Sequence, residues 1–207
     1  MRKTLIAASL AATILSCQPA SAGILKDHWS VITSFGAFGV LRAGSPWANN
    51  PQPSVVTLID EAYRPENELW NSNSIWWDQD PSVNENQPWI TIDLDASYSF
   101  NRFKVQADDN DSYLLEYWDG AAWQTAFNVG AVYTYGLVTR DSGIIGTITT
   151  NKLRFTATGG DNYYAVSEIE GFAPEVPEPA SWALMIAGFA AIGAGLRRNR
   201  QLAVSFG

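Results

Sequence analysis

Two short segments of this sequence place aromatic residues beside acidic or amide side chains. A pyranose face stacks on a flat aromatic ring, and a few polar groups beside the ring fix the sugar's orientation. We therefore expect a sugar site at a loop end of the fold, built from these candidates: Trp76, Trp77, Asp78, Tyr163 and Tyr164. Successive strand residues face opposite ways, so one of the two adjacent tryptophans faces outward, to bind a ligand or to pack under residues 24–53.

Cation binding is a second candidate chemistry, at the run Asp108-Asp109-Asn110-Asp111. Calcium takes several hard oxygen ligands, and this run offers three carboxylates. The run lacks the spacing of an EF-hand loop. Asp and Asn residues are also ordinary in turns before strands. We therefore expect a solvated turn at this position.

Catalytic chemistry finds little support in the residue types. The sole histidine, His28, lies near the expected mature terminus, which disfavours a Ser-His-Asp or Cys-His apparatus. A carboxylate pair for glycoside hydrolysis stays open, because the sequence does not give carboxylate separations. We expect a protein without enzymatic activity, with a glycan-processing enzyme as the third alternative.

The charge of the central region limits its partners. Between Gly23 and Val176 there are 8 Lys and Arg and 20 Asp and Glu, a formal charge of about −12, within a chain whose net charge is −8. Such a domain repels phosphate backbones, so we expect no nucleic-acid partner. Calcium, neutral glycans and basic partners remain compatible with this charge.

The amino terminus has the order of a signal peptide. Arg2 and Lys3 precede an apolar run, which ends before Ala20-Ser21-Ala22. We expect signal peptidase to remove residues 1–22 by cutting between Ala22 and Gly23. Lipoprotein processing at Cys17 is the alternative, although Leu15 fits that motif poorly. Cleavage before Gly23 removes the only cysteine, so the exported domain would contain no disulfide.

The composition changes abruptly from Val176, and we assign residues 175–207 to a separate C-terminal region. Pro177-Glu178-Pro179 precedes an apolar stretch, which we expect to form a single membrane-spanning helix over about 180–196. The arginines that follow would remain on the cytoplasmic side and leave the domain outside.

This order of residues closely resembles the PEP-CTERM sorting signal of exported bacterial proteins. The resemblance implies processing by an exosortase, in bacteria that make exopolysaccharide. It also assigns the recognition motif and the basic retention signal to these residues: Pro177, Glu178, Pro179, Arg197, Arg198 and Arg200.

The central region, 23–174, is rich in strand signals. The segment 89–94 alternates, with Ile90, Ile92 and Leu94 on one face. Further strands are expected over 102–106, 112–118, 144–149, 152–157 and 167–172. No helix-length periodic stretch occurs between residues 55 and 172, so we predict an all-β sandwich.

The order of these segments resembles a discoidin-like, or galactose-binding-like, jelly roll over about residues 57–172. The pieces that carry the resemblance are Leu58-Ile59-Asp60, Trp76-Trp77, the segment 87–94, Phe103-Lys104-Val105 and the segment 167–172. The resemblance implies a sugar or lipid site in the loops at one end. It also implies a structural calcium ion at Asp60 and Glu168.

Together these features predict an exported, envelope- or matrix-associated module that binds carbohydrate, with the producer's exopolysaccharide as the expected partner. A structural surface or biofilm protein without specific sugar binding is the alternative.

Overall fold

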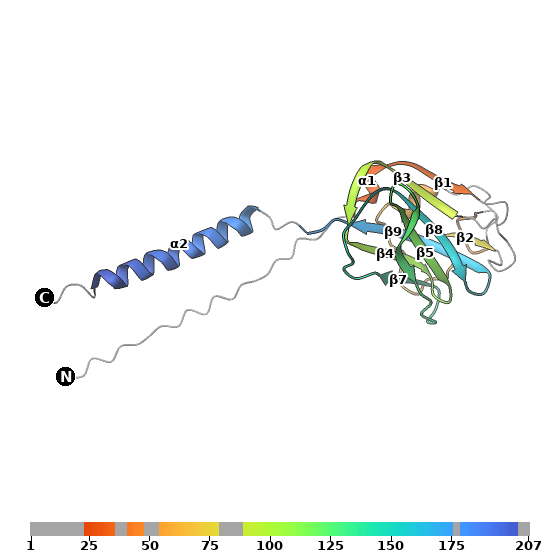
Figure 1. Ribbon diagram of the computed structural model, residues 1–207. Coiled ribbons are helices and arrows are strands. Elements are labelled where there is room, and N and C mark those ends of the chain that lie inside the picture. The colour runs from red at the N-terminus through yellow and green to blue at the C-terminus, as the bar shows by residue number, and fades with distance from the viewer. Residues whose placement is uncertain (1–22, 36–40, 48–53, 79–88, 176–178, 203–207) are drawn as a thin grey trace, which may run out of the picture.

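Two antiparallel sheets make up most of the central domain in the part of the chain that the structure describes (Figure 1). The computed structural model describes residues 23–35, 41–47, 54–78, 89–175 and 179–202. The five-stranded sheet has the order β1-β3-β8-β5-β6, and the four-stranded sheet has the order β2-β9-β4-β7. Its elements are α1 (Leu25–His28), β1 (Trp29–Phe35), η1 (Val55–Leu58), β2 (Ile75–Asp78), β3 (Trp89–Phe100), β4 (Arg102–Asp108), β5 (Ser112–Trp118), β6 (Trp123–Val129), β7 (Leu137–Asp141), β8 (Ile148–Gly159), β9 (Tyr163–Phe172) and α2 (Pro179–Leu202).

The all-β prediction is therefore confirmed. The alternation in β3 buries the expected face, since Ile90 and Ile92 are each 1% exposed. Two predicted strands, 144–149 and 152–157, prove to be one strand, β8, and residues 144–147 lie outside it. Gly143 has a φ of 63°, and Ile144 is largely exposed, so the chain enters β8 later than the apolar pattern suggests.

The core lies between the inner faces of the two sheets and is rich in aromatic rings. Tyr113 stacks on Phe155 with ring centroids 5.1 Å apart, and Trp77 lies 5.8 Å from Tyr164. Aromatic side chains of this size each bury about 150–250 Å². This packing supplies the stability that the disulfide-free domain needs.

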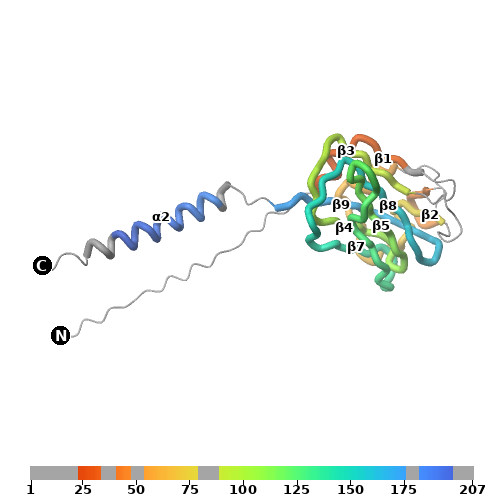
Figure 2. Tube along the Cα trace, viewed as in Figure 1, coloured from red at the N-terminus to blue at the C-terminus, as the bar shows by residue number. Residues whose placement is uncertain are grey.

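Strand β9 connects the two ends of the sandwich. It pairs with β2 on one side and β4 on the other, antiparallel to both. Tyr163 begins the strand at the end where β2 finishes, and Phe172 finishes it close to Gly23. Figure 2 shows the blue end of β9 leaving the sandwich toward α2.

Candidate functional site

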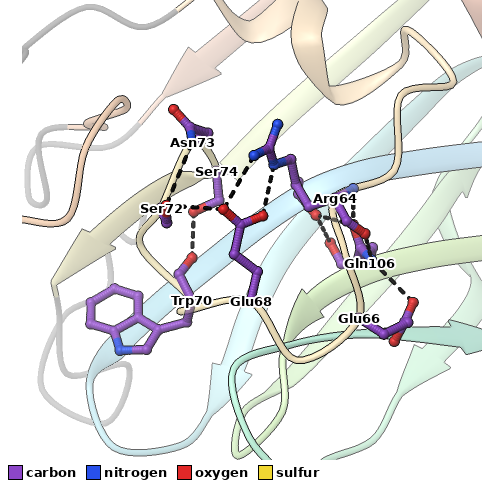
Figure 3. A network of polar contacts seen from close by, with 9 residues as sticks. Arg64, Glu66, Glu68, Trp70, Ser72, Asn73, Ser74 and Gln106 are labelled. Atoms are coloured by element: carbon purple, nitrogen blue, oxygen red, sulfur yellow. Dashed lines mark hydrogen bonds and ion pairs between the residues drawn. The ribbon is translucent and has the colours of Figure 1, made fainter.

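The segment from Asp60 to Ser74 crosses the outer face of the four-stranded sheet and supports the candidate site. Its Arg64 backbone exchanges hydrogen bonds with the Gln106 side chain on β4, at 2.8 and 2.9 Å. Further along, Asn67 N donates to Leu137 O, and Leu137 N donates to Glu68 O. Figure 3 shows the contacts between Arg64 and Gln106. The segment is thus fixed across two strands although it has no regular structure.

A second set of contacts shapes the turn that follows. The Arg64 guanidinium donates two hydrogen bonds to the Glu68 carboxylate, at 3.0 and 3.2 Å, and Ser72 Oγ donates to the same carboxylate. The hydrogen bonds from Arg64 lower the pKa of Glu68. Ser74 Oγ donates to Trp70 O, which closes the turn. These contacts position Trp70 over the sheet (Figure 3).

Four aromatic side chains meet where β2 ends and β9 begins, and we call them the tryptophan cluster: Trp47, Trp70, Trp76 and Tyr163. Trp47 contacts the other three edge to face, with ring centroids 5.4 to 5.9 Å away. Trp76 is only 4% exposed at the base, whereas Trp47 is 62% and Tyr163 42% exposed. The cluster thus has a buried floor and an exposed aromatic rim.

Residues 41–43 complete the cluster from the side of β2. Arg42 forms a two-way backbone bridge with Trp76, at 2.9 and 3.0 Å. Its guanidinium lies 4.6 Å from the Trp76 ring centroid and donates to Asp78 Oδ1 at 2.9 Å. The site therefore places a guanidinium and a carboxylate beside the exposed rings, the combination that orients a polar ligand on an aromatic surface.

Trp47 has a backbone conformation that few bulky residues adopt. Its φ is 59°, in the left-handed region, which costs an aromatic residue about 1–3 kcal/mol. Strain of this kind is often retained at ligand sites. The left-handed conformation places the Trp47 ring at the exposed rim of the cluster.

The five predicted ligand residues divide between the core and this site. Trp77 and Tyr164 are 2% and 1% exposed and lie in the core, so their rings offer no free face to a sugar. Trp76 is covered by residues 41–47 and by Trp70. This arrangement is the second alternative given above, in which the outward-facing tryptophan packs under residues 24–53. Asp78 and Tyr163 remain accessible and lie at the site.

Sequence reasoning missed Arg42, Trp47 and Trp70. No strand pattern surrounds Trp47, and its approach to β2 depends on the bridge between Arg42 and Trp76. The sequence did contain a signal for the two tryptophans. Trp47 and Trp70 lie in segments without strand periodicity, where a buried position in the core is not expected.

Residues 109 and 110 form the predicted turn, but the prediction that this turn is solvated was wrong. Asp108 is 3%, Asp109 8% and Asp111 0% exposed. Asp111 accepts hydrogen bonds from Asp161 N and from the Tyr113 hydroxyl, at 3.2 and 3.1 Å. These interactions draw the turn inward, under the start of β9.

Burial changes the acidity of two of these carboxyls. It raises the pKa of Asp108 to about 8, helped by the charge of Asp111. It also raises the pKa of Asp111 to about 7, against the opposing effects of the Asp161 and Tyr113 hydrogen bonds. Arg140 lies beside them and donates to the backbone oxygens of Ala107 and Asp108.

The two predicted calcium ligands, Asp60 and Glu168, come together although they are far apart in sequence. Ala62 N donates to both Asp60 Oδ1 and Glu168 Oε2, at 3.0 and 3.2 Å. Glu168 is fully buried, and its Oε1 has no hydrogen-bond partner among the described residues. Burial, followed by the charge of Asp60, raises the pKa of Glu168 to about 9.

This pair fits a calcium ion in its donor chemistry. An unpaired buried carboxylate oxygen is costly, and a hard cation would satisfy it. Within the described ranges no group of three or more His, Cys, Asp and Glu side chains is placed to hold a metal. Backbone oxygens would therefore have to supply most of the remaining ligands.

The C-terminal segment forms the helix α2. Its described side chains from Trp182 to Leu196 are exposed, as is Arg197. Pro179 begins the helix, and Arg198 and Arg200 lie within it. Pro177 and Glu178 lie outside the described residues, as do Ala20, Ala22 and the rest of the expected signal peptide.

The predicted membrane span over about 180–196 is not confirmed. No helix in the part of the chain that the structure describes is both long enough and apolar enough to cross a membrane. The apolar run Trp182–Leu196 is shorter than the roughly 20 residues that a span requires, and α2 continues into basic and polar residues.

Comparison with known families locates a sorting signal in this segment. Residues 175–200 match the PEP-CTERM protein-sorting motif. This match confirms the resemblance recognised in the sequence, and it covers only the C-terminal segment. No curated protein matches the chain.

Solved structures similar to this chain include family 32 carbohydrate-binding modules of Clostridium perfringens. One is CpGH89CBM32-5 in complex with GalNAc-β-1,3-galactose, with 15% identity and a TM-score of 0.46, covering 73% of this chain and 100% of that chain. Another is the family 32 module of NanJ in complex with galactose, with 9% identity and a TM-score of 0.43, covering 68% and 93%.

Proposed function

We propose that this protein is exported, sorted through its C-terminal motif, and displays a non-catalytic carbohydrate-binding module at the cell surface or in the extracellular matrix. The tryptophan cluster is the observation that carries the proposal. Its exposed Trp47 and Tyr163 rings surround a buried aromatic floor, and the Arg42–Asp78 ion pair lies beside them.

The tryptophan cluster and the Arg42–Asp78 ion pair beside it each support one aspect of sugar recognition. The faces and edges of Trp47 and Tyr163 offer apolar area to the C–H groups of a pyranose ring. Asp78 accepts hydrogen bonds from hydroxyls, and Arg42 donates them. The contacts of Trp70 and Trp76 with the rim limit the rotamer freedom of Trp47 and Tyr163. Less side-chain entropy is therefore lost when a ligand binds.

The ligand we propose is an extracellular polysaccharide made by the producing cell. A neutral or weakly charged glycan is compatible with a domain of about −12 formal charge, whereas a polyanion would be repelled. Signal peptidase and an exosortase are the processing partners in this proposal, which the sorting motif at 175–200 supports.

The test is binding of neutral and acidic polysaccharides to the chain that begins at Gly23, measured by affinity electrophoresis and calorimetry. We expect Trp47→Ala and Tyr163→Ala each to weaken binding about tenfold or more, equivalent to about 1.4 kcal/mol, because each removes an exposed stacking surface. Trp123→Ala is the matched control, since Trp123 lies on the other sheet under Arg154.

Equal binding by the two rim variants and the unmodified chain would exclude the tryptophan cluster as the sugar site. Absence of binding to every glycan, with calcium-dependent self-association instead, would favour the structural surface protein. Glycan turnover that is lost on replacing a single carboxylate would show an enzyme.

We include a structural calcium ion at Asp60 and Glu168 in the proposed function. The buried, unpaired Oε1 of Glu168 supports it. When bound, the ion would supply positive charge to two carboxylates that otherwise repel each other. Its role would be to fix the segment after η1 against β9, because the two ligands belong to those elements.

A further inference from the structure

Gly23, the first residue after the predicted signal-peptide cleavage, is already placed in the fold. It forms an isolated antiparallel bridge with Phe172, and one hydrogen bond of this bridge runs from Ile24 N to Gly171 O at 2.9 Å. In such a non-hydrogen-bonded pair the N–H of the bridged residue points away from the partner strand. The Gly23 nitrogen is therefore not used in pairing with β9.

Two carboxylates lie against this residue. A methyl group added to Gly23 Cα would lie 3.0 Å from Glu61 Oε1 and 3.3 Å from Glu170 Oε1. The nitrogen of a residue is about 2.5 Å from its Cβ position, so the Gly23 nitrogen lies within about 5.5 Å of Glu61 Oε1. By the same reasoning it lies within about 5.8 Å of Glu170 Oε1, so an ammonium at this nitrogen would be close enough to interact with both carboxylates.

These carboxylates belong to an acidic group that, among the described residues, has more carboxylates than the two lysines that face it. Glu170 is 8% exposed and accepts a hydrogen bond from the Tyr63 hydroxyl, which is neutral. Glu168 and Asp60 lie close by, as the effect of both Glu170 and Asp60 on the pKa of Glu168 shows. Lys26 of α1 lies 3.7 Å from Glu61, and Lys104 of β4 is the cross-strand partner of Glu170.

We propose that the α-ammonium group created by cleavage before Gly23 docks on Glu61 and Glu170 and locks the N-terminal segment onto the end of β9. In the uncleaved precursor this nitrogen is an uncharged amide and cannot form the ion pair. Signal-peptide removal thus completes the fold as well as releasing the chain. Gly23 suits this position because a side chain there would crowd both carboxylates.

The test compares two chains that end at Gly207, one beginning at Gly23 and one retaining Ser21-Ala22. We expect the Gly23 chain to melt about 3–5 °C higher at pH 6.5. A folded-state ion pair raises the pKa of the amine above its usual value of about 7.7–8.0. The advantage is therefore complete below about pH 7.7 and disappears as the pH rises through the raised pKa.

The second measurement is the pKa of the Gly23 amine, from the pH dependence of its reaction with an amine-specific reagent. We expect a value about one unit above 7.7–8.0 in the Gly23 chain, and a lower value in Glu61→Gln and Glu170→Gln. The control is Asp27→Asn, which removes an exposed carboxylate of α1. Experiments in EDTA exclude bound calcium as another source of positive charge.

Equal melting temperatures for the two chains, together with an ordinary amine pKa, would overturn the proposal. A raised pKa that Glu61→Gln leaves unchanged would overturn the assignment of Glu61, even if Glu170→Gln does not fold. Because the readout is the terminal amine and not a glycan, failure of this proposal is distinguishable from failure of the sugar-binding proposal.

Discussion

Asp108 shows how a single side chain departs from its expected role. In the sequence it begins a run of polar residues that is typical of a turn, but in the structure it is 3% exposed. Its Oδ1 accepts a hydrogen bond from Asp109 N, and the Arg140 guanidinium donates to its backbone oxygen. The carboxyl group is therefore held in place where its charged form is disfavoured.

The pKa of Asp108 predicts a pH-dependent stability. Its value of about 8 lies above the unfolded value of about 3.9. Between these two pKa values the folded state keeps a proton on Asp108 that the unfolded state has lost. The stability that depends on this proton is fully present below about pH 4 and is lost as the pH rises through about 8. We expect Asp108→Asn to melt at the same temperature as the unmodified chain at pH 4 and several degrees higher at pH 9.

Melting curves at intervals of one pH unit in EDTA measure this difference. Asp27→Asn is the control, since it removes an exposed carboxylate. A melting difference that stays constant from pH 4 to 9 would contradict the burial of charge at Asp108.

The segment 60–74 comes into close contact with the chain at Gly136, the residue just before β7. This residue has a φ of 60°, and a methyl group on it would lie 2.0 Å from Glu68 O. The close approach allows the hydrogen bonds by which residues 67 and 68 pair with Leu137. Trp70 follows directly, so the position of the tryptophan cluster depends on this contact.

We expect Gly136→Ala to destabilise the domain by at least about 2 kcal/mol, because it combines left-handed strain of about 1–2 kcal/mol with a backbone clash. It should also weaken glycan binding, since Trp70 would move. Gly130→Ala is the matched control, because a methyl group there meets nothing within 4 Å. Denaturant unfolding and glycan affinity measure both effects, and an unchanged stability would contradict the described contact.

The strands that sequence reasoning found are those whose patterns are local. The apolar residues Ile90, Ile92 and Leu94 alternate along β3 and are buried, as are Phe103 and Val105 in β4, so both strands could be predicted. Strand β2 could not, because its residues Ile75, Trp76 and Trp77 are all buried and give no alternation. The outer covering of Trp76 comes from residues distant in sequence.

The candidate site was predictable only in part for the same reason. Asp78 and Tyr163 have suitable chemistry, which the sequence shows, whereas their positions at the ends of β2 and β9 come from the structure. The contributions of Trp47 and Trp70 depend on non-local hydrogen bonds, such as Asn73 N to Gly44 O at 2.6 Å. The family resemblance was needed to pair Asp60 with Glu168, since their separation along the chain gives no sign of contact.

At the scale of the whole domain, the proposed calcium ion predicts a large effect on stability. Saturation at about 100 times the dissociation constant would stabilise the folded state by about 2.7 kcal/mol. For a domain of this size the melting temperature should rise by about 5–10 °C. Melting curves in calcium and in EDTA measure this rise.

Glu168→Gln should abolish the rise and, in EDTA above pH 7, melt higher than the unmodified chain, because the buried amide carries no charge to desolvate. Glu175→Gln, which changes an exposed carboxylate, is the control. A rise that persists in Glu168→Gln would place the ion elsewhere.

The course of β9 has a mechanical consequence. A ligand held at Tyr163 pulls on the first residue of this strand, and the C-terminal segment that carries the sorting motif leaves just after its last residue. Tension between a polysaccharide and the cell would therefore act along β9, parallel to the strand. Load that enters at Tyr163 would pass along the covalent backbone of β9. Load that enters through Trp76 on β2 would reach β9 across their hydrogen bonds, which lie perpendicular to the strands and would share it in shear instead of opening one after another. A strand that is paired on both sides and runs on into the C-terminal segment would resist a load applied between the proposed ligand site and the sorting motif.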